Sequence, residues 1–151
     1  MAMTMNGQVQ LPAKRETVWA KLNDADVLKS CIPGSEQFER VSENEFQAVA
    51  TVKVGPVKAR WKGKVRLSDL DPPNSYRISG EGEGGVAGFA KGGAKVSLAD
   101  KDGGTLLSYN VEAQVGGKLA QLGQRLINGA AKKVADDFFK NFAAAVSPKS
   151  E

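Results

Sequence analysis

The sequence predicts a single α+β domain in which a curved antiparallel sheet wraps a long C-terminal helix. Two observations carry this prediction. Residues 46–115 alternate between apolar and polar side chains over most of their length, whereas residues 118–146 change to a helical period. Strands in series followed by one helix are typical of α+β proteins and not of βαβ units. The 151 residues suit one domain, 1–151, with an ordered core over about 5–146 and a short tail over 147–151.

The N-terminal part is expected to form one strand and two short helices. Residues 5–11 alternate as a strand, and residues 14–22 carry their apolar side chains on one helical face. Asp24 suits the N-cap of a second short helix that runs through Ser30. The dipeptide Pro33-Gly34 then predicts a turn.

The middle of the chain is a series of strands, because successive side chains of a strand point to opposite faces. The clearest alternation places Val57, Ala59, Trp61, Gly63, Val65 and Leu67 on one face. The other face carries Lys58, Arg60, Lys62, Lys64 and Arg66. The remaining inward positions are Phe46, Ala48, Ala50, Val52 and Val54; Tyr76, Ile78, Gly80 and Gly82; Ala94, Val96 and Leu98; and Leu107, Tyr109, Val111, Ala113 and Val115. Turns are expected at 71–74 and 101–104, and a glycine-rich connection over 82–93.

One continuous helix is predicted from Lys118 to about Val146, a length of roughly 40 Å at 1.5 Å per residue. Its apolar stripe consists of Leu119, Leu122, Leu126, Ala130, Val134, Phe138 and Phe142. A helix of this length has to be covered by the sheet. Several inward sheet positions are small, namely Ala48, Ala50, Ala59, Gly63, Gly80, Gly82 and Ala113. A wide sheet that faces a helix across small side chains predicts a cavity, unless larger neighbours fill the space.

The predicted cavity suits an apolar ligand, because its lining is almost entirely apolar. The expected ligand-binding residues are Phe46, Ala48, Ala59, Trp61, Tyr76, Ile78, Phe89, Tyr109, Val111, Leu119, Leu122, Leu126 and Ala130. The hydroxyl groups of Tyr76 and Tyr109 could orient a polar head group. Residue by residue, packing in the core explains these positions as well as ligand contact does.

The composition excludes several classes of catalytic site. The chain has no histidine, which removes imidazole acid–base chemistry, histidine zinc sites and the usual serine or cysteine triads. Its single cysteine, Cys31, has no cation or helix N-terminus nearby in the sequence and is interpreted as buried packing. The acidic pairs Asp136-Asp137 and Glu81/Glu83 point apart or towards water. We therefore expect no catalytic residues, no metal and no cofactor.

A mild basic excess, with a net charge of +4, permits an anionic partner or membrane surface. The five cations over 58–66 form a candidate docking surface, although a solvated face or protection against edge pairing explains them equally well. Nucleic acid is a poor candidate, because the stripe has no interleaved aromatic residues. No signal peptide or bilayer-length apolar run is present, so a cytoplasmic location is expected.

The glycine-rich segment formally matches a dinucleotide fingerprint over residues 82–87. That interpretation fails, because a strand and not a helix N-terminus is expected to follow. A hairpin connection is the simpler hypothesis. The functional alternative is a mobile gate over the cavity that consists of Gly84, Gly85, Gly88 and Phe89, with Phe89 as an apolar plug.

An ordered set of short motifs resembles a known family. The motifs are Leu28-x-x-Cys31-Ile32-Pro33-Gly34, Val52-x-Val54-Gly55-Pro56-Val57, Gly80-x-Gly82-x-Gly84-Gly85-x-Ala87-Gly88, Gly104-Thr105-x-Leu107-x-Tyr109, and Gly117-x-Leu119-Ala120-x-Leu122-Gly123-x-Arg125-Leu126-Ile127. Together they resemble the family of CoxG, a subunit of carbon monoxide dehydrogenase, within the START-like, helix-grip (SRPBCC) superfamily. The resemblance runs from about Gln8 to Phe142.

The resemblance implies a helix-grip fold with seven strands and a cavity between sheet and helix. It also implies association with subunits of a carbon monoxide dehydrogenase-type molybdenum hydroxylase, and peripheral contact with the inner face of the membrane. The expected function is that of a non-catalytic carrier that binds a respiratory quinone or a lipid. The first alternative is a maturation or membrane-docking factor that binds no small molecule. The second is an enzyme of the aromatase or cyclase type, with Tyr76 and Tyr109 as the available acid–base groups. Some family members carry a C-terminal membrane-attaching tail, whereas this sequence ends at Glu151.

Overall fold

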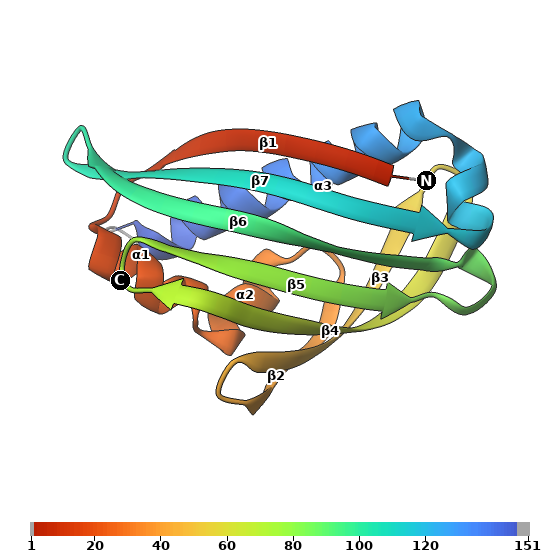
Figure 1. Cartoon of the computed structure of the whole chain (residues 1–151), viewed down its shortest axis with the longest axis horizontal. Helices are drawn as coiled ribbons and strands as arrows, with labels where there is room; N and C mark the ends of the chain where they lie inside the picture. The colour runs from red at the N-terminus through yellow and green to blue at the C-terminus, as the bar shows by residue number, and fades with distance from the viewer. Residues whose placement is uncertain (1, 148–151) are drawn as a thin grey trace.

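The computed structural model describes residues 2–147 and contains one seven-stranded antiparallel sheet with its helices on one face (Figure 1). The strands are β1 (Ala2–Leu11), β2 (Ser35–Ser42), β3 (Glu45–Val54), β4 (Val57–Asp71), β5 (Ser75–Glu83), β6 (Phe89–Lys101) and β7 (Gly104–Gly116). The helices are α1 (Arg15–Leu22), α2 (Ala25–Cys31) and α3 (Gln124–Val146), with 3₁₀ segments η1 (Gly85–Ala87) and η2 (Gly117–Leu122). The strand order is β1-β7-β6-β5-β4-β3-β2. The predicted α+β class, seven-stranded sheet and long C-terminal helix are confirmed.

The two short helices lie where the sequence predicts them. The carboxylate of Asp24 accepts hydrogen bonds from the backbone N–H groups of Asp26 and Val27, so Asp24 is the N-cap of α2. Gly34 has a φ of +74° in the turn that follows α2. At this position a Cβ would lie 2.1 Å from the carbonyl oxygen of Thr51, so only glycine fits.

The predicted continuous helix over 118–146 is wrong at its start. Residues 117–122 form η2, and α3 begins only at Gln124. Gly123 separates the two segments with a φ of +91°, which a right-handed helix does not contain. The first strand also starts earlier than predicted, at Ala2, because Met3 and Met5 continue its inward alternation and pair with β7. The predicted tail residues 148–151 lie outside the described residues.

Most of the predicted glycine-rich connection is strand. Gly82 lies in β5, Gly92 and Gly93 lie in β6, and only residues 84–88 form the turn. The middle strands lie close together at these glycines. A Cβ at Gly92 would lie 2.2 Å from the carbonyl oxygen of Glu112, and one at Gly63 would lie 2.5 Å from that of Glu81.

The buried core consists of two clusters between the sheet and the helices. The larger one lies where α1, α2 and the C-terminal half of α3 meet the sheet, and it includes Leu11, Val18, Phe46 and Phe142. The smaller one lies near η2 and consists of Met3, Val115, Leu119 and Ile127. α3 is therefore packed on the sheet near both of its ends.

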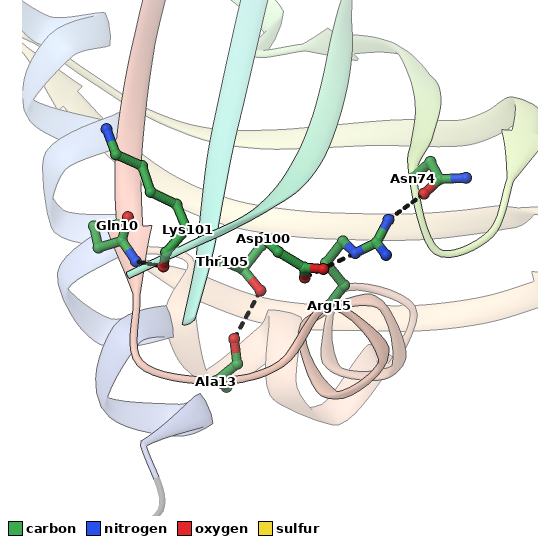
Figure 2. Close-up of polar contacts among 7 residues, drawn as sticks. All are labelled: Gln10, Ala13, Arg15, Asn74, Asp100, Lys101 and Thr105. Carbon is green, nitrogen blue, oxygen red and sulfur yellow. Dashed lines mark hydrogen bonds and ion pairs between the residues drawn. The ribbon is translucent and has the colours of Figure 1, made fainter. Parts of the chain in front are cut away.

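Polar contacts fix the segment between β1 and α1 to the far ends of the strands (Figure 2). The hydroxyl of Thr105, which is fully buried, donates to the carbonyl oxygen of Ala13 at 2.7 Å. Arg15 pairs with Asp100, with Nε to Oδ1 at 2.9 Å, and also donates to Asn74 Oδ1. The amide of Gln10 donates to the carbonyl oxygen of Lys101 at 2.7 Å.

Thr105→Val is expected to lower the free energy of unfolding by about 1–3 kcal/mol, because it leaves the Ala13 carbonyl without its donor at a buried site. Chemical denaturation measures this loss. Thr51→Val is the matched control, since the Thr51 hydroxyl donates at the surface to Glu36 and its loss should cost well under about 1 kcal/mol. Equal losses in the two variants would contradict a special role for the Thr105 contact.

Candidate functional site

The register of the sheet brings most of the predicted ligand-binding residues to one face. Ala48 pairs with Gly63, and Val52 pairs with Ala59. Tyr76 pairs with Val96, which in turn pairs with Tyr109. Cross-strand partners share a face of a sheet. The residues on the α3 side therefore include Phe46, Ala48, Ala59, Trp61, Tyr76, Ile78, Tyr109 and Val111.

Two of these residues are sealed in the larger core cluster. Phe46 is 0% exposed, packs against the ring of Phe38 at 5.0 Å, and has the guanidinium of Arg40 over its own ring. Tyr76 is also buried, and its ring meets that of Trp19 edge-on at 5.3 Å. Burial raises the pKa of Tyr76 well above its ordinary value, so the phenol stays neutral. Both side chains act as core packing in this conformation.

Apolar side chains between the two core clusters are less covered. Ala59, Trp61, Ala130 and Val52 are half-buried, although the strand residues face α3. Leu126 and Val134 of α3 are 40% and 38% exposed. Leu126, Ala130 and Val134 are spaced by four residues and so form one stripe along α3. The sheet and α3 thus leave apolar surface accessible between their two anchoring points.

The start of α3 lies next to the β3–β4 hairpin. A Cβ at Gly55, the first residue of the hairpin turn, would lie 2.7 Å from Cδ2 of Leu126. The predicted helix wall is therefore only partly enclosed: Leu119 is buried and Leu122 and Ala130 are half-buried, whereas Leu126 is exposed beside the hairpin. Ile127, which the predicted stripe omits, is buried instead. The break at Gly123 rotates the stripe relative to a helix counted continuously from Leu119.

The turn at residues 84–88 covers Trp61. A Cβ at Gly84 would lie 2.9 Å from the indole ring, and Ala87 is buried. Gly85 and Gly88 have φ values of +62° and +115°, and Val86 is 88% exposed. The segment also packs against η2. It therefore lies over one end of the half-buried surface, where the predicted gate would have to be.

Phe89 does not face the interior, so its predicted placement is wrong. Phe89 pairs with Glu83 and Gly116, which lie on the outer face of the sheet, and its side chain is 46% exposed. The ring lies over Gly116, where a Cβ would be 2.2 Å from the ring. Counting back in steps of two from Val96 places Ala90 inward and Phe89 outward. The alternation within β6 could have revealed this, because the turn at 84–88 breaks the count from β5.

The predicted docking surface faces water, but it is partly neutralised. The five cations of residues 58–66 are exposed on the outer face. Arg60 pairs with Glu36 at 3.3 Å, and Arg66 with Glu45 at 3.7 Å. The register also places Lys62 opposite Glu83 and Lys64 opposite Glu81. Lys58 lies opposite Lys53 and has no such compensation in the sheet.

Tyr109 reaches the edge of the sheet. Its hydroxyl lies where the side chain of residue 7 would be, since a Cβ at Gly7 would be 2.5 Å from it. Its ring stacks on Phe139 of α3 at 5.2 Å. Tyr109 and Phe139 belong to the lining of a groove of about 640 Å³ between β1 and α3. Tyr109 thus joins the interior to this groove.

The described residues offer no catalytic constellation. Within 2–147, no group of three or more His, Cys, Asp or Glu side chains could hold a metal ion. Cys31 is buried, and burial raises the pKa of its thiol, which disfavours the reactive thiolate. β6 follows the glycine segment, which leaves no helix N-terminus for a pyrophosphate. No helix in 2–147 is long and apolar enough to cross a membrane.

Comparisons with known proteins agree with this architecture. The family model of the CoxG subunit of carbon monoxide dehydrogenase matches residues 7–147. A conserved protein from Geobacillus kaustophilus is 34% identical, with a TM-score of 0.90 over 95% of each chain. A START superfamily protein from Mycobacterium smegmatis has a TM-score of 0.72 at 12% identity and covers 95% of this chain and 96% of its own.

An aromatase/cyclase from Streptomyces sp. R1128 has a TM-score of 0.71 at 12% identity over 97% of this chain and 94% of its own. No curated protein matched. At these identities the last two structures support the fold alone. The family match covers nearly the whole chain, and the seven-stranded sheet with its long C-terminal helix is START-like. The chain therefore belongs to the carbon monoxide dehydrogenase CoxG family within the START-like, helix-grip (SRPBCC) superfamily.

Proposed function

We propose that this protein is a non-catalytic accessory protein of a carbon monoxide dehydrogenase-type molybdenum hydroxylase and carries an apolar ligand between its sheet and α3. The observation that carries the proposal is the incompletely covered apolar surface between the two core clusters. Native interiors are close-packed, so accessible apolar surface that faces an interior favours occupation by a ligand. Family membership supports the hydroxylase as the partner.

A respiratory quinone is the preferred ligand, and a lipid is the other. An oxidase that delivers electrons to a membrane pool needs contact with a quinone, and a ring with an isoprenoid chain suits a long apolar surface. Burial of the chain would supply the affinity, at roughly 25 cal/mol per Å² before the costs of association. The Tyr109 hydroxyl, at the margin of this surface, can donate to a quinone carbonyl.

Native mass spectrometry of the protein as purified, followed by solvent extraction, tests the carrier function. We expect a stoichiometric quinone or lipid. An apo mass that stays unchanged after incubation with quinones and lipids would contradict the proposal. The alternative would then hold: a maturation or membrane-docking factor that acts through the outer cationic face and binds no small molecule.

Ala59→Phe is expected to reduce ligand occupancy at least tenfold, because its side chain faces α3 beside Trp61 and a phenyl group would fill the accessible space. Ala99→Phe is the matched control. Ala99 lies in β6 on the outer face and is exposed, so the same change should leave occupancy unaltered. Circular dichroism establishes that both variants fold. Equal occupancy in folded Ala59→Phe would place the ligand elsewhere.

A further inference from the structure

The two edges of the sheet differ in how they are protected from pairing with another strand. β2, at one edge, carries charged residues at Glu36, Glu39 and Arg40, has two register shifts in its pairing with β3, and packs against α2. Charges, bulges and a covering helix are the devices that prevent edge-to-edge association. β2 therefore has the features of a closed edge.

β1, at the other edge, has none of these features. Residues 2–11 contain no charged residue and no proline, and all ten pair with β7 without a register shift. Among the described residues, β1 has β7 as its only partner strand. Long, regular and uncharged edge strands are templates for strand addition. Figure 1 shows β1 along the upper margin of the sheet with α3 behind it.

The backbone groups that β1 offers can be assigned. The carbonyl oxygen of Ala2 accepts from the side-chain amide of Gln124 at 3.0 Å, so it points away from β7. In an antiparallel ladder, alternate residues direct both their N–H and C=O groups to the same side. Thr4, Asn6, Gln8 and Gln10 therefore present their backbone donors and acceptors at the outer edge.

The edge is reachable because a groove separates it from α3. This groove, of about 640 Å³, is lined by residues 3–9, by Tyr109, and by Asn128, Lys132, Asp136, Phe139, Lys140 and Ala143 of α3. Gly7 adds no side chain there. A strand laid along β1 could hydrogen-bond to the edge and place alternate side chains in the groove.

We propose that this edge is a homodimer interface, in which β1 pairs antiparallel with β1 of a second copy about a two-fold axis at Asn6. In that register Asn6 lies opposite itself and Thr4 lies opposite Gln8 of the second copy, so all outward side chains are neutral and polar. On the inner side, the long Met5 lies opposite Gly7 of the second copy. The strand is therefore complementary to itself in backbone, charge and side-chain size.

The charges on α3 fit the same axis. Gln124 is level with Ala2, and four strand residues further on, at about 3.3 Å each, Asn6 is level with about residue 133 at 1.5 Å per helical residue. Lys132 and Asp136 flank that level and pair with each other at 2.9 Å. A two-fold axis between them brings Lys132 of one copy opposite Asp136 of the other, which avoids like-charge repulsion. This alternation favours a second copy over a strand of unrelated sequence.

Sedimentation velocity of the full chain over a concentration series tests the proposal. Strand pairing with a groove rim is a small interface, so we expect a monomer–dimer equilibrium that shifts towards monomer on dilution. Asn6→Lys combined with Gln8→Lys should weaken the dimer at least tenfold, because lysines at an edge deter pairing. Ser79→Lys with Ser97→Lys is the control for added charge, since both positions lie on the outer face of central strands. A wild-type monomer at every concentration, or a dimer that the edge lysines leave intact, would overturn the proposal.

Cross-linking tests the axis. Asn6→Cys should give covalent dimers with a short thiol–thiol reagent, whereas Gln10→Cys should give far fewer, because residue 10 lies about 26 Å from its counterpart at 3.3 Å per residue. Cys31 is 1% exposed and should react slowly in both variants. Absence of cross-links at residue 6, or equal yields at both positions, would overturn this register. Ligand content is independent of the result, so failure here leaves the proposed carrier function standing.

Discussion

Phe142→Ala is expected to lower the free energy of unfolding by about 3–5 kcal/mol, the range for truncating a fully buried aromatic residue. Phe142 is 0% exposed and stacks on Phe138 at a centroid distance of 5.7 Å. It belongs to the cluster in which the C-terminal half of α3 meets α1, α2 and the sheet. Next to it, the Asn141 side chain donates to the carbonyl oxygen of Cys31 at 3.1 Å, which also fixes α3 to α2. Urea denaturation followed by tryptophan fluorescence measures the loss.

Val134→Ala is the control on the same helix. Val134 lies two turns before Phe142 on α3 but is 38% exposed, so its truncation should cost less than about 1 kcal/mol. The contrast matters for function, because it separates the part of α3 that holds the fold together from the part that is free to contact a ligand. A loss at Val134 as large as that at Phe142 would mean that the middle of α3 is packed as tightly as its end.

The alternation of the strands was sufficient to predict the sheet and its inner face. Strict period-two patterns, such as that over residues 57–67, force one set of side chains to each face whatever the neighbouring strands are. The change to a helical period after Gly117 likewise predicted α3. These features depend on local sequence, which is why they could be predicted without any tertiary contact.

Features that depend on chain direction after a turn could not be predicted in this way. The φ of +91° at Gly123 breaks the C-terminal helix, so the stripe counted from Leu119 does not continue to Leu126. The turn at 84–88 breaks the count into β6, and Phe89 changes face. In both places glycine permits the backbone conformation without specifying it. The structure is needed to say which conformation is adopted.

The outer face illustrates a different limit. The sequence shows five cations in one strand but not what lies opposite them. The register supplies Glu81 and Glu83 from β5, and Glu36 and Glu45 form ion pairs from the other side. Pairing between distant segments thus converts an apparent basic stripe into a mixed surface. Its contribution to docking has to be measured.

Reversal of four cations, Lys58, Arg60, Lys62 and Lys64 to Glu, should weaken association with anionic surfaces without changing ligand content. Each Lys or Arg near an anionic leaflet strengthens binding about fivefold, so four unpaired cations would contribute several hundred-fold. The neighbouring carboxylates reduce this, and we expect a loss of roughly 10- to 100-fold. Co-sedimentation with vesicles of phosphatidylglycerol and phosphatidylcholine measures it, and native mass spectrometry measures the ligand.

A variant with the same net charge separates the location of the cations from their number. Reversal of Lys14, Lys29, Lys118 and Arg125 to Glu gives the same change in charge at exposed positions away from the outer face of the sheet. If both variants lose vesicle binding equally, the outer face is not a specific docking surface. If the outer-face variant alone loses binding and retains its ligand, loading and docking use different surfaces. Loss of the ligand together with docking would instead mean that the sheet cannot change its outer charges without disturbing its inner face, which the independence of the two faces of a strand argues against.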